Sequence, residues 1–140
     1  MKTQQLRWLI PVVGFVVFVM AGYAGWGLWL RTEPEVGKDM SVRIPDFSSV
    51  AQAGRTPYER SCARCHGVHG AGSPSGPPLV HSIYRPALHA DVAFSLVVQR
   101  GVRAHHWRFG DMPPQADLAS GDIAAITRYI RELQVANAID

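Results

Sequence analysis

Cys62-Ala63-Arg64-Cys65-His66 is the stretch of sequence on which the fold of this chain depends. The two residues between the cysteines space both thiols suitably along one helical turn, and a histidine follows directly. This C-x-x-C-H pattern is typical of c-type haem attachment. In that chemistry the thiols add to the two vinyl groups on one edge of the porphyrin, and the histidine is aimed at the iron. The motif predicts one haem c, covalently attached through Cys62 and Cys65.

Three other interpretations of the motif are weaker. A thioredoxin-like redox pair would need a preceding strand in a βαβ setting, and the sequence shows neither. A zinc site built from Cys62, Cys65, His66 and His69 would crowd its ligands together without the usual spacer between ligand pairs. A disulfide between the two cysteines would close a strained loop and stabilise the chain little.

The iron of a haem held at this motif needs two axial ligands, and His66 is the proximal one that the motif predicts. For the other position the sequence offers Met112, His105, His106 and Met40. We expect Met112, because the prolines that follow it make a stiff loop that can hold a thioether with little ordering cost. Ligation by two histidines would lower the reduction potential, and whether His105 or His106 contacts the haem stays open. Met40 lies in a linker segment, and the alternative role for Met112 is filling a gap in the core.

Residues 51–137 resemble the class I c-type cytochromes. The matching features, in chain order, are the four-residue spacing of Gly54, Tyr58 and Cys62, the segment Gly76-Pro77-Pro78-Leu79, the segment Gly110-Asp111-Met112-Pro113-Pro114, and the pair Ile126 and Tyr129. The resemblance implies a small all-α haem domain whose closing helix packs against its first helix. It also implies that the Pro77 carbonyl hydrogen-bonds His66 and that Met112 is the second axial ligand.

The chain departs from the family pattern at Pro57, where the first helix of the family is already running. Thr56-Pro57-Tyr58-Glu59 reads as a capping box with proline at the first helical position. This pattern predicts a short helix that begins at Thr56 and leaves Gly54 outside it. The close helix crossing that the family makes at its glycine is then not expected.

Two further helices are predicted after the haem motif. The first spans Asp91 to Arg100, with Asp91 as its N-cap and Gly101 as its stop signal. The second is capped by Ser120, and its apolar residues recur at helical spacing as Ile123, Ile126, Ile130 and Leu133. No convincing alternating strand pattern is present, so the predicted fold class is all-α.

An uncharged stretch of 23 residues runs from Trp8 to Leu30. As a helix it would be about 35 Å long, enough to cross the hydrocarbon core of a bilayer. It is longer than the apolar core of a signal peptide and ends in a poor cleavage site. We therefore expect residues 1–30 to form a membrane anchor that spans at 8–30, and residues 31–50 to form a tether. Lys2 and Arg7 precede the stretch and place the N-terminus in the cytoplasm.

Composition excludes several classes of protein. The chain has 140 residues, of which 47% are hydrophobic, so it is long enough for one domain and too apolar to be disordered throughout. Its two cysteines are too few for a disulfide scaffold. The net charge is only +3 and no basic cluster occurs, so the sequence predicts no nucleic-acid partner.

Together these features predict a membrane-anchored monohaem cytochrome of the bacterial inner membrane, with its haem domain in the periplasm. It would pass single electrons between periplasmic redox partners, alone or as a subunit of a respiratory or photosynthetic complex, without a small-molecule substrate or enzymatic activity of its own. Arg103, Trp107 and Arg108 are candidates to hydrogen-bond the haem propionates. The alternative is a haem-based peroxidase or gas sensor with a labile sixth ligand, in which His105 or His106 acts as a distal base.

Overall fold

The computed structural model describes residues 3–31 and 41–140. The chain divides into two units, residues 1–35 and 36–140, and each is described by itself. Lys2, the tether residues 32–40 and the candidate ligand Met40 lie outside the described residues.

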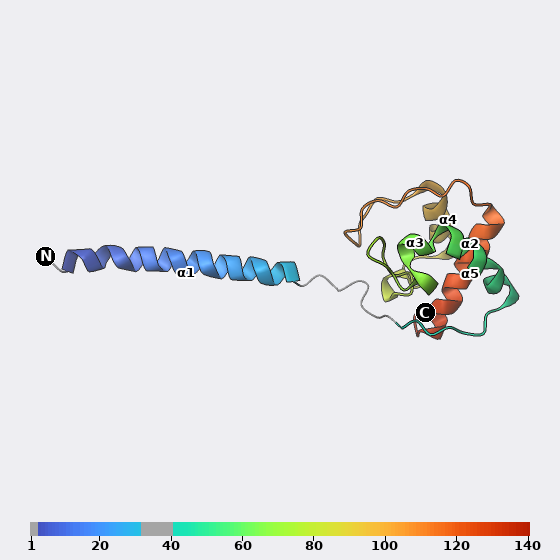
Figure 1. The fold of residues 1–140 in the computed structure, drawn as a ribbon, viewed down its shortest axis with the longest axis horizontal. Coiled ribbons are helices and arrows are strands. Elements are labelled where there is room, and N and C mark those ends of the chain that lie inside the picture. The colour runs from blue at the N-terminus through green and yellow to red at the C-terminus, as the bar shows by residue number, and fades with distance from the viewer. Residues whose placement is uncertain (1–2, 32–40) are drawn as a thin grey trace. The chain divides into compact units, whose positions relative to one another are not determined.

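The first unit contains the helix α1 (Thr3–Arg31), drawn in blue in Figure 1. Its side chains from residue 12 to residue 26 are exposed, and most of them are apolar. For the described part of the chain, no helix combines the length and the apolar character that crossing a bilayer requires. The predicted membrane span at 8–30 is therefore not supported by the structure.

The second unit is helical. Its α-helices are α2 (Ser49–Ser61), α3 (Ala63–His66), α4 (Asp91–Arg100) and α5 (Ser120–Ala136), and its 3-10 turns are η1 (Val68–Gly70) and η2 (Ser82–Tyr84). Across residues 3–31 and 41–140 there is no strand, and the β-type pairing is limited to two isolated bridges. The all-α class predicted for the haem domain is confirmed.

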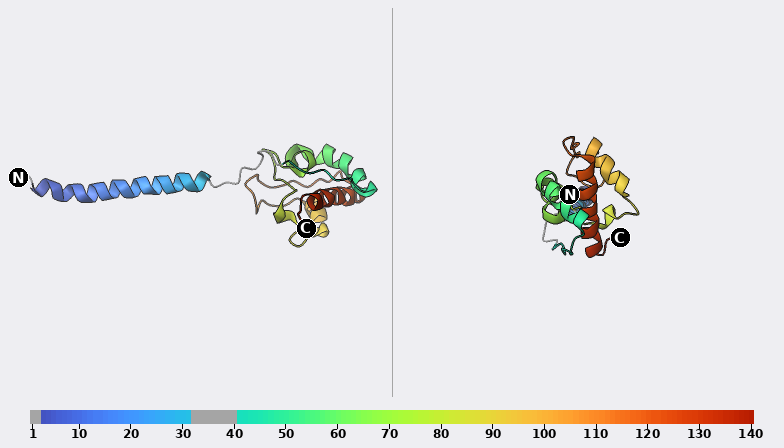
Figure 2. Two further views of the ribbon diagram at one scale, coloured as in Figure 1. Left: turned by 90° about the horizontal axis from the view of Figure 1, so that it is seen from below. Right: turned by 90° about the vertical axis from the view of Figure 1, so that its right-hand side faces the viewer.

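The core of this unit is built around α5, which lies between α2 and α4 (Figure 2). The contact between α2 and α5 is the most extensive, and it contains the fully buried side chains of Tyr58 and Tyr129. At Gly54 the two backbones meet so closely that a Cβ atom would lie 2.0 Å from the carbonyl oxygen of Ala125. A residue without a side chain is therefore required there.

The prediction that this helix begins at Thr56 is wrong, because α2 begins at Ser49. Its N-cap is Ser48, whose hydroxyl accepts a hydrogen bond from the amide of Ala51 at 3.2 Å. The Glu132 side chain of α5 in turn accepts hydrogen bonds from the amide and the hydroxyl of Ser48, at 2.9 and 2.7 Å. The start of the helix is thus fixed by a residue 84 positions away, and Gly54 makes the close crossing after all.

Pro57 lies inside α2 rather than at its first turn. It lacks the amide hydrogen that would bond within the helix, a loss that typically costs about 3 kcal/mol in a helix interior. Glu59 does not cap the helix, because its carboxylate accepts a hydrogen bond from Nε of Arg55, at 2.7 Å. The packing of α2 on α5 outweighs the local preference for a helix start at Thr56.

The bounds predicted for α4 are confirmed, with Gly101 at its C-terminal end in a positive-φ conformation (φ 72°). The caps predicted for α4 and α5 are not found, because Asp91 and Ser120 are the first helical residues and the capping positions are Ala90 and Ala119. The Asp91 carboxylate is instead paired with a guanidinium of α5, as described below.

The first described residues of the second unit lie beside its C-terminal residues (Figure 1). Arg43 and Asn137 exchange two hydrogen bonds of 2.9 Å, one through each backbone polar group of Arg43. The ring of Phe47 packs against that of Tyr129, with the centroids 5.0 Å apart. Residues 41–48, which the sequence assigns to the tether, therefore pack on the helical unit.

Candidate functional site

The cysteine motif forms a helical turn, as its spacing predicts. Cys62 joins α2 to α3, and its carbonyl accepts hydrogen bonds from the amides of Cys65 and His66 at 3.1 and 2.9 Å. Cys62 is buried, Cys65 is half-buried, and the two thiols are not joined to each other. Gly67 then turns the chain with φ 75°, at a point where a Cβ atom would lie 2.1 Å from the carbonyl oxygen of Gly72.

The imidazole of His66 is buried and held by one hydrogen bond. Its Nδ1 lies 2.9 Å from the carbonyl oxygen of Pro77. Because a carbonyl can only accept, Nδ1 carries the proton and Nε2 keeps a free lone pair. Burial lowers the pKa of His66, and the hydrogen bond to Pro77 opposes that shift only in part. A neutral imidazole with a free Nε2 is the form that binds iron, and the bond to Pro77 that the family resemblance implies is present.

The environment of the two cysteines does not suit the other interpretations of the motif. Burial, and to a lesser degree the neighbouring Cys65, raise the pKa of the free Cys62 thiol to about 11. A redox-active pair requires a thiolate with a lowered pKa instead. His69 is hydrogen-bonded through Nδ1 to the hydroxyl of Tyr129 at 2.6 Å. Among the described residues, His69 does not join the cysteines and His66 in a cluster able to hold a metal ion.

A cavity opens beside Cys62 and His66, with an empty volume of about 940 Å³ that includes a part open to solvent. Its wall is mostly apolar, and the residues that contribute are Leu79, Ala93, Phe94, Val97, Val98, Val102, Phe109, Ile126 and Ile130. A porphyrin face needs such a surface, so the residues present fit a haem attached at the motif. Cys65 is the one motif cysteine that does not line the cavity.

Met112 lies on the wall of the same cavity as His66. Its backbone pairs with that of Val102 through hydrogen bonds of 2.9 and 3.0 Å, so residues 102–112 form a closed loop, here called the 102–112 hairpin. Past the prolines, the amide of Gln115 donates to the carbonyl of Val98 in α4 at 2.7 Å. The loop that carries Met112 is thus fixed to the end of α4 on both sides.

The three predicted propionate contacts are placed differently from one another. Arg103 and Trp107 line the cavity, and Arg108 is not among its lining residues. The indole Nε1 of Trp107 donates to the hydroxyl of Tyr84 at 3.0 Å, so its one donor is used within the protein. His105 and His106, whose relation to the haem the sequence leaves open, also line the cavity.

Sequence reasoning missed the residue that fixes the segment before α4. Arg131 of α5 is buried, and its guanidinium donates to Asp91 Oδ1 at 2.8 Å and to the carbonyl of Tyr84 at 2.7 Å. It also donates to the carbonyl of His89 and lies over the ring of Phe94, 4.6 Å from its centroid. The signal in the sequence is a charged residue directly beside the apolar stripe of the last helix.

One comparison with known proteins identifies the domain. Residues 51–134 match the family model of cytochrome c, a span that includes both cysteines, His66 and Met112. No curated protein matches the chain.

Proposed function

The chain belongs to the cytochrome c family and is an electron-transfer haem protein, and from that premise we propose that His66 and Met112 are the axial ligands of a single haem. Cytochrome c domains carry covalently attached haem c, and Cys62 and Cys65 form the attachment motif. One observation carries the proposal: Cys62, His66 and Met112 all line one mostly apolar cavity.

Each residue has a defined part in this proposal. The Pro77 carbonyl fixes the tautomer and the orientation of His66, so that Nε2 is presented to the iron. The 102–112 hairpin holds Met112 at the cavity wall, where its thioether would be the second ligand of the iron. The haem supplies an iron that changes between the ferrous and ferric states, at a potential raised by methionine ligation.

The surroundings of the cavity favour electron transfer over bond chemistry. With His66 and Met112 both holding the iron, no position would be left open for a substrate. Residues such as Val98 and Ile130 make much of the wall apolar, and an apolar wall around a haem tunes the potential of its iron.

Substitution of Met112 tests the ligand assignment. We expect Met112→Ala to abolish the weak ferric absorption band at the red edge of the visible spectrum and to allow carbon monoxide to bind the ferrous protein. Val97→Ala is the control, because Val97 lines the same cavity but offers no ligand atom. A band that survives in Met112→Ala would show that another side chain fills the sixth position.

A haem-based peroxidase or gas sensor is the competing function, and the observation in its favour is that His105 and His106 line the same cavity. A distal imidazole can act as the acid–base group of such a site. This function requires a sixth ligand that leaves readily. A high-spin spectrum and rapid carbon monoxide binding in the unsubstituted protein would support it and overturn the electron-transfer assignment.

We also propose that residues 8–30 anchor the protein in the bacterial inner membrane, with the haem domain in the periplasm. The support comes from the sequence alone, namely the uncharged run of 23 residues and the positive charges of Lys2 and Arg7 before it. The anchor would keep the haem domain near membrane-bound donors and acceptors and so raise their effective concentration.

Membrane fractionation tests the anchor. The full chain should stay with the membrane after a high-pH carbonate wash, and Val17→Arg should weaken that association because a cation at the centre of a span costs about 3 kcal/mol. Val17→Leu is the matched control. Recovery of the unsubstituted chain in the soluble fraction would refute the anchor without affecting the ligand assignment.

A further inference from the structure

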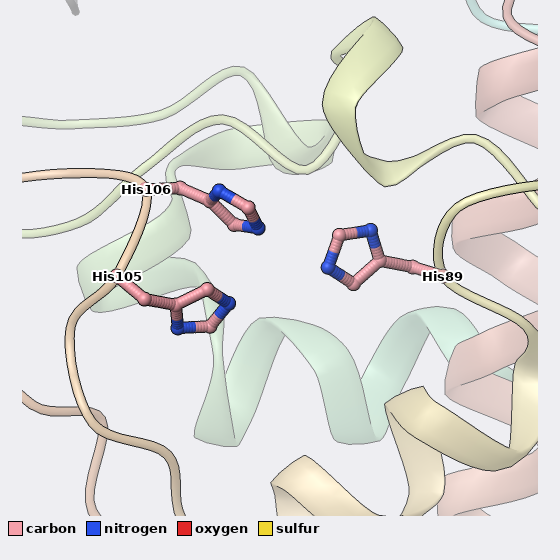
Figure 3. A group of neighbouring side chains, drawn as sticks. All are labelled: His89, His105 and His106. Atoms are coloured by element: carbon pink, nitrogen blue, oxygen red, sulfur yellow. The ribbon is translucent and has the colours of Figure 1, made fainter.

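We propose that His89, His105 and His106 form a binding site for a divalent transition-metal ion at the edge of the haem cavity, separate from the haem iron. Figure 3 shows the three rings facing a common space, one from the turn before α4 and two from the 102–112 hairpin. The proposal goes beyond electron transfer, because it assigns the protein a second, non-haem metal site.

The geometry is close to that of an occupied site. One nitrogen atom from each ring lies within 4.8 Å of the others. A tetrahedral zinc ion with Zn–N bonds of about 2.0–2.1 Å needs nitrogen atoms about 3.4 Å apart. The cluster would therefore have to close by at most about 1.4 Å, a movement within reach because His105 and His106 are exposed side chains on a loop.

The backbone sets two of the three rings in the form that binds metal. His89 Nδ1 lies 2.7 Å from the carbonyl oxygen of Ile83, and His105 Nδ1 lies 2.8 Å from the carbonyl oxygen of Arg103. Since a carbonyl only accepts, each Nδ1 carries its proton and each Nε2 has a free lone pair. Metal-binding histidines are typically oriented by such a hydrogen bond from the other ring nitrogen.

The donor set selects the kind of ion. Three neutral imidazoles suit zinc, copper and nickel, whereas calcium and magnesium prefer oxygen ligands. No carboxylate belongs to the cluster. We therefore expect zinc or copper to bind, with water in the remaining coordination position.

An ion at this site would connect the hairpin to the helical core. His105 and His106 are held in the hairpin by the Val102–Met112 pairing and by the amide of Ala104, which donates to Asp111 Oδ1 at 2.9 Å. The His89 carbonyl is bound by the buried Arg131. A bridge from His89 to the hairpin would thus restrain the loop that carries Met112, and we expect bound zinc to raise the unfolding temperature of the haem domain.

Calorimetric titration of the haem-loaded full chain, prepared without a polyhistidine tag, tests the site. We expect one zinc ion per chain, an affinity at least about tenfold lower in His89→Ala, and no stoichiometric binding in the double variant His105→Ala/His106→Ala. His69→Ala is the matched control, because it removes an imidazole that bonds Tyr129 and lies outside the cluster.

Two spectra complete the test. The visible haem spectrum of each variant verifies that it folds and keeps its axial ligands. Copper bound in place of zinc should show nitrogen hyperfine structure in its paramagnetic resonance spectrum, and that structure should be lost in the double variant. The proposal is overturned if the haem-loaded chain binds no stoichiometric zinc, if His69→Ala weakens binding as much as His89→Ala, or if zinc addition alters the haem ligands.

Discussion

The two sides of α5 differ in how they are held together. On the α2 side, α5 packs directly against protein. Gly54 allows the backbone of α2 to approach that of Ala125 closely, and Tyr58 packs on Tyr129 with ring centroids 5.3 Å apart. On the α4 side, most of the facing surface lines a cavity, and the chain closes it only at the edges, through Arg131 and the 102–112 hairpin. The first side is completed by protein and the second by the haem. The contrast shows how a cofactor can complete the core of a small domain.

Removal of the haem should produce the largest difference in stability between the two sides of α5. In Cys62→Ser/Cys65→Ser the apolar wall of the cavity loses its partner. We expect the amides of α4 to lose nearly all protection from hydrogen exchange, while those at the crossing of α2 and α5 keep measurable protection. Exchange measured residue by residue by nuclear magnetic resonance checks this. Equal loss on both sides would mean that the α2 side also depends on the haem.

The crossing itself should be broken by Gly54→Val. The added side chain would meet the backbone of Ala125, which cannot move aside as a flexible side chain could. We expect a loss of about 3 kcal/mol or more in the free energy of unfolding, measured by urea denaturation of the haem-loaded protein. Gly121→Ala is the control, since no heavy atom lies within 4 Å of a Cβ atom there. A cost for Gly54→Val below about 1 kcal/mol would contradict the close crossing.

Arg131→Met tests the edge of the cavity side. It removes the donors to Asp91, Tyr84 and His89, and we expect the free energy of unfolding to fall by about 2 kcal/mol. Arg128→Met is the matched control, because its side chain is 59% exposed and its pair with Glu132 is worth less than about 1 kcal/mol. Thermal unfolding of both variants decides the point, and equal losses would show that the buried network contributes nothing specific.

The smallest effect is expected at the start of α2. Ser48→Ala should cost about 1 kcal/mol, measured by urea denaturation, and Ser120→Ala should cost less because Ser120 is not the N-cap of its helix. Burial tends to raise the pKa of Glu132, but the hydrogen bonds from Ser48, together with the hydrogen bond and charge of Arg128, outweigh it and the pKa is lowered. The carboxylate therefore stabilises the fold above its unfolded pKa of 4.5, and this stability is lost as the pH falls through the lowered value.

The prediction for Ser48→Ala can also be tested through its dependence on pH. The difference between the unsubstituted protein and Ser48→Ala should be complete near neutral pH and should shrink on acidification below pH 4.5. A difference that does not depend on pH would show that the hydrogen bond from the Ser48 hydroxyl to Glu132 does not contribute to it.

The sequence predicted those features of the fold that are determined by neighbouring residues. Gly101 marks the end of α4 because its positive φ suits glycine, and the apolar residues at helical spacing in α5 are buried. The cysteine motif predicted a helical turn because the spacing of its residues is itself helical. The bond between His66 and Pro77 came from the family resemblance and not from the residues themselves.

The errors occur where distant residues override a local preference. Thr56-Pro57 is a strong local start signal, but α2 begins earlier because Glu132 holds Ser48 from the far end of the domain. Asp91 is a good cap by type, yet it pairs with Arg131, 40 positions away. The two partners of each contact lie too far apart for a local sequence pattern to include both, so neither contact could be predicted from the sequence. The histidine cluster was missed for the same reason, since His89 and the hairpin meet only in the fold.

The paired hydrogen bonds between Arg43 and Asn137 have a consequence for how the domain can be rearranged. Because residue 43 and the C-terminal residues are adjacent, a short linker can join them with little loss of chain entropy. The chain can then be opened at the exposed turn of Ala116 and Asp117, which would place α5 ahead of α2 without disturbing their crossing. The same adjacency lets the domain be inserted as a module into a surface loop of another protein, since it enters and leaves the host at nearly the same point.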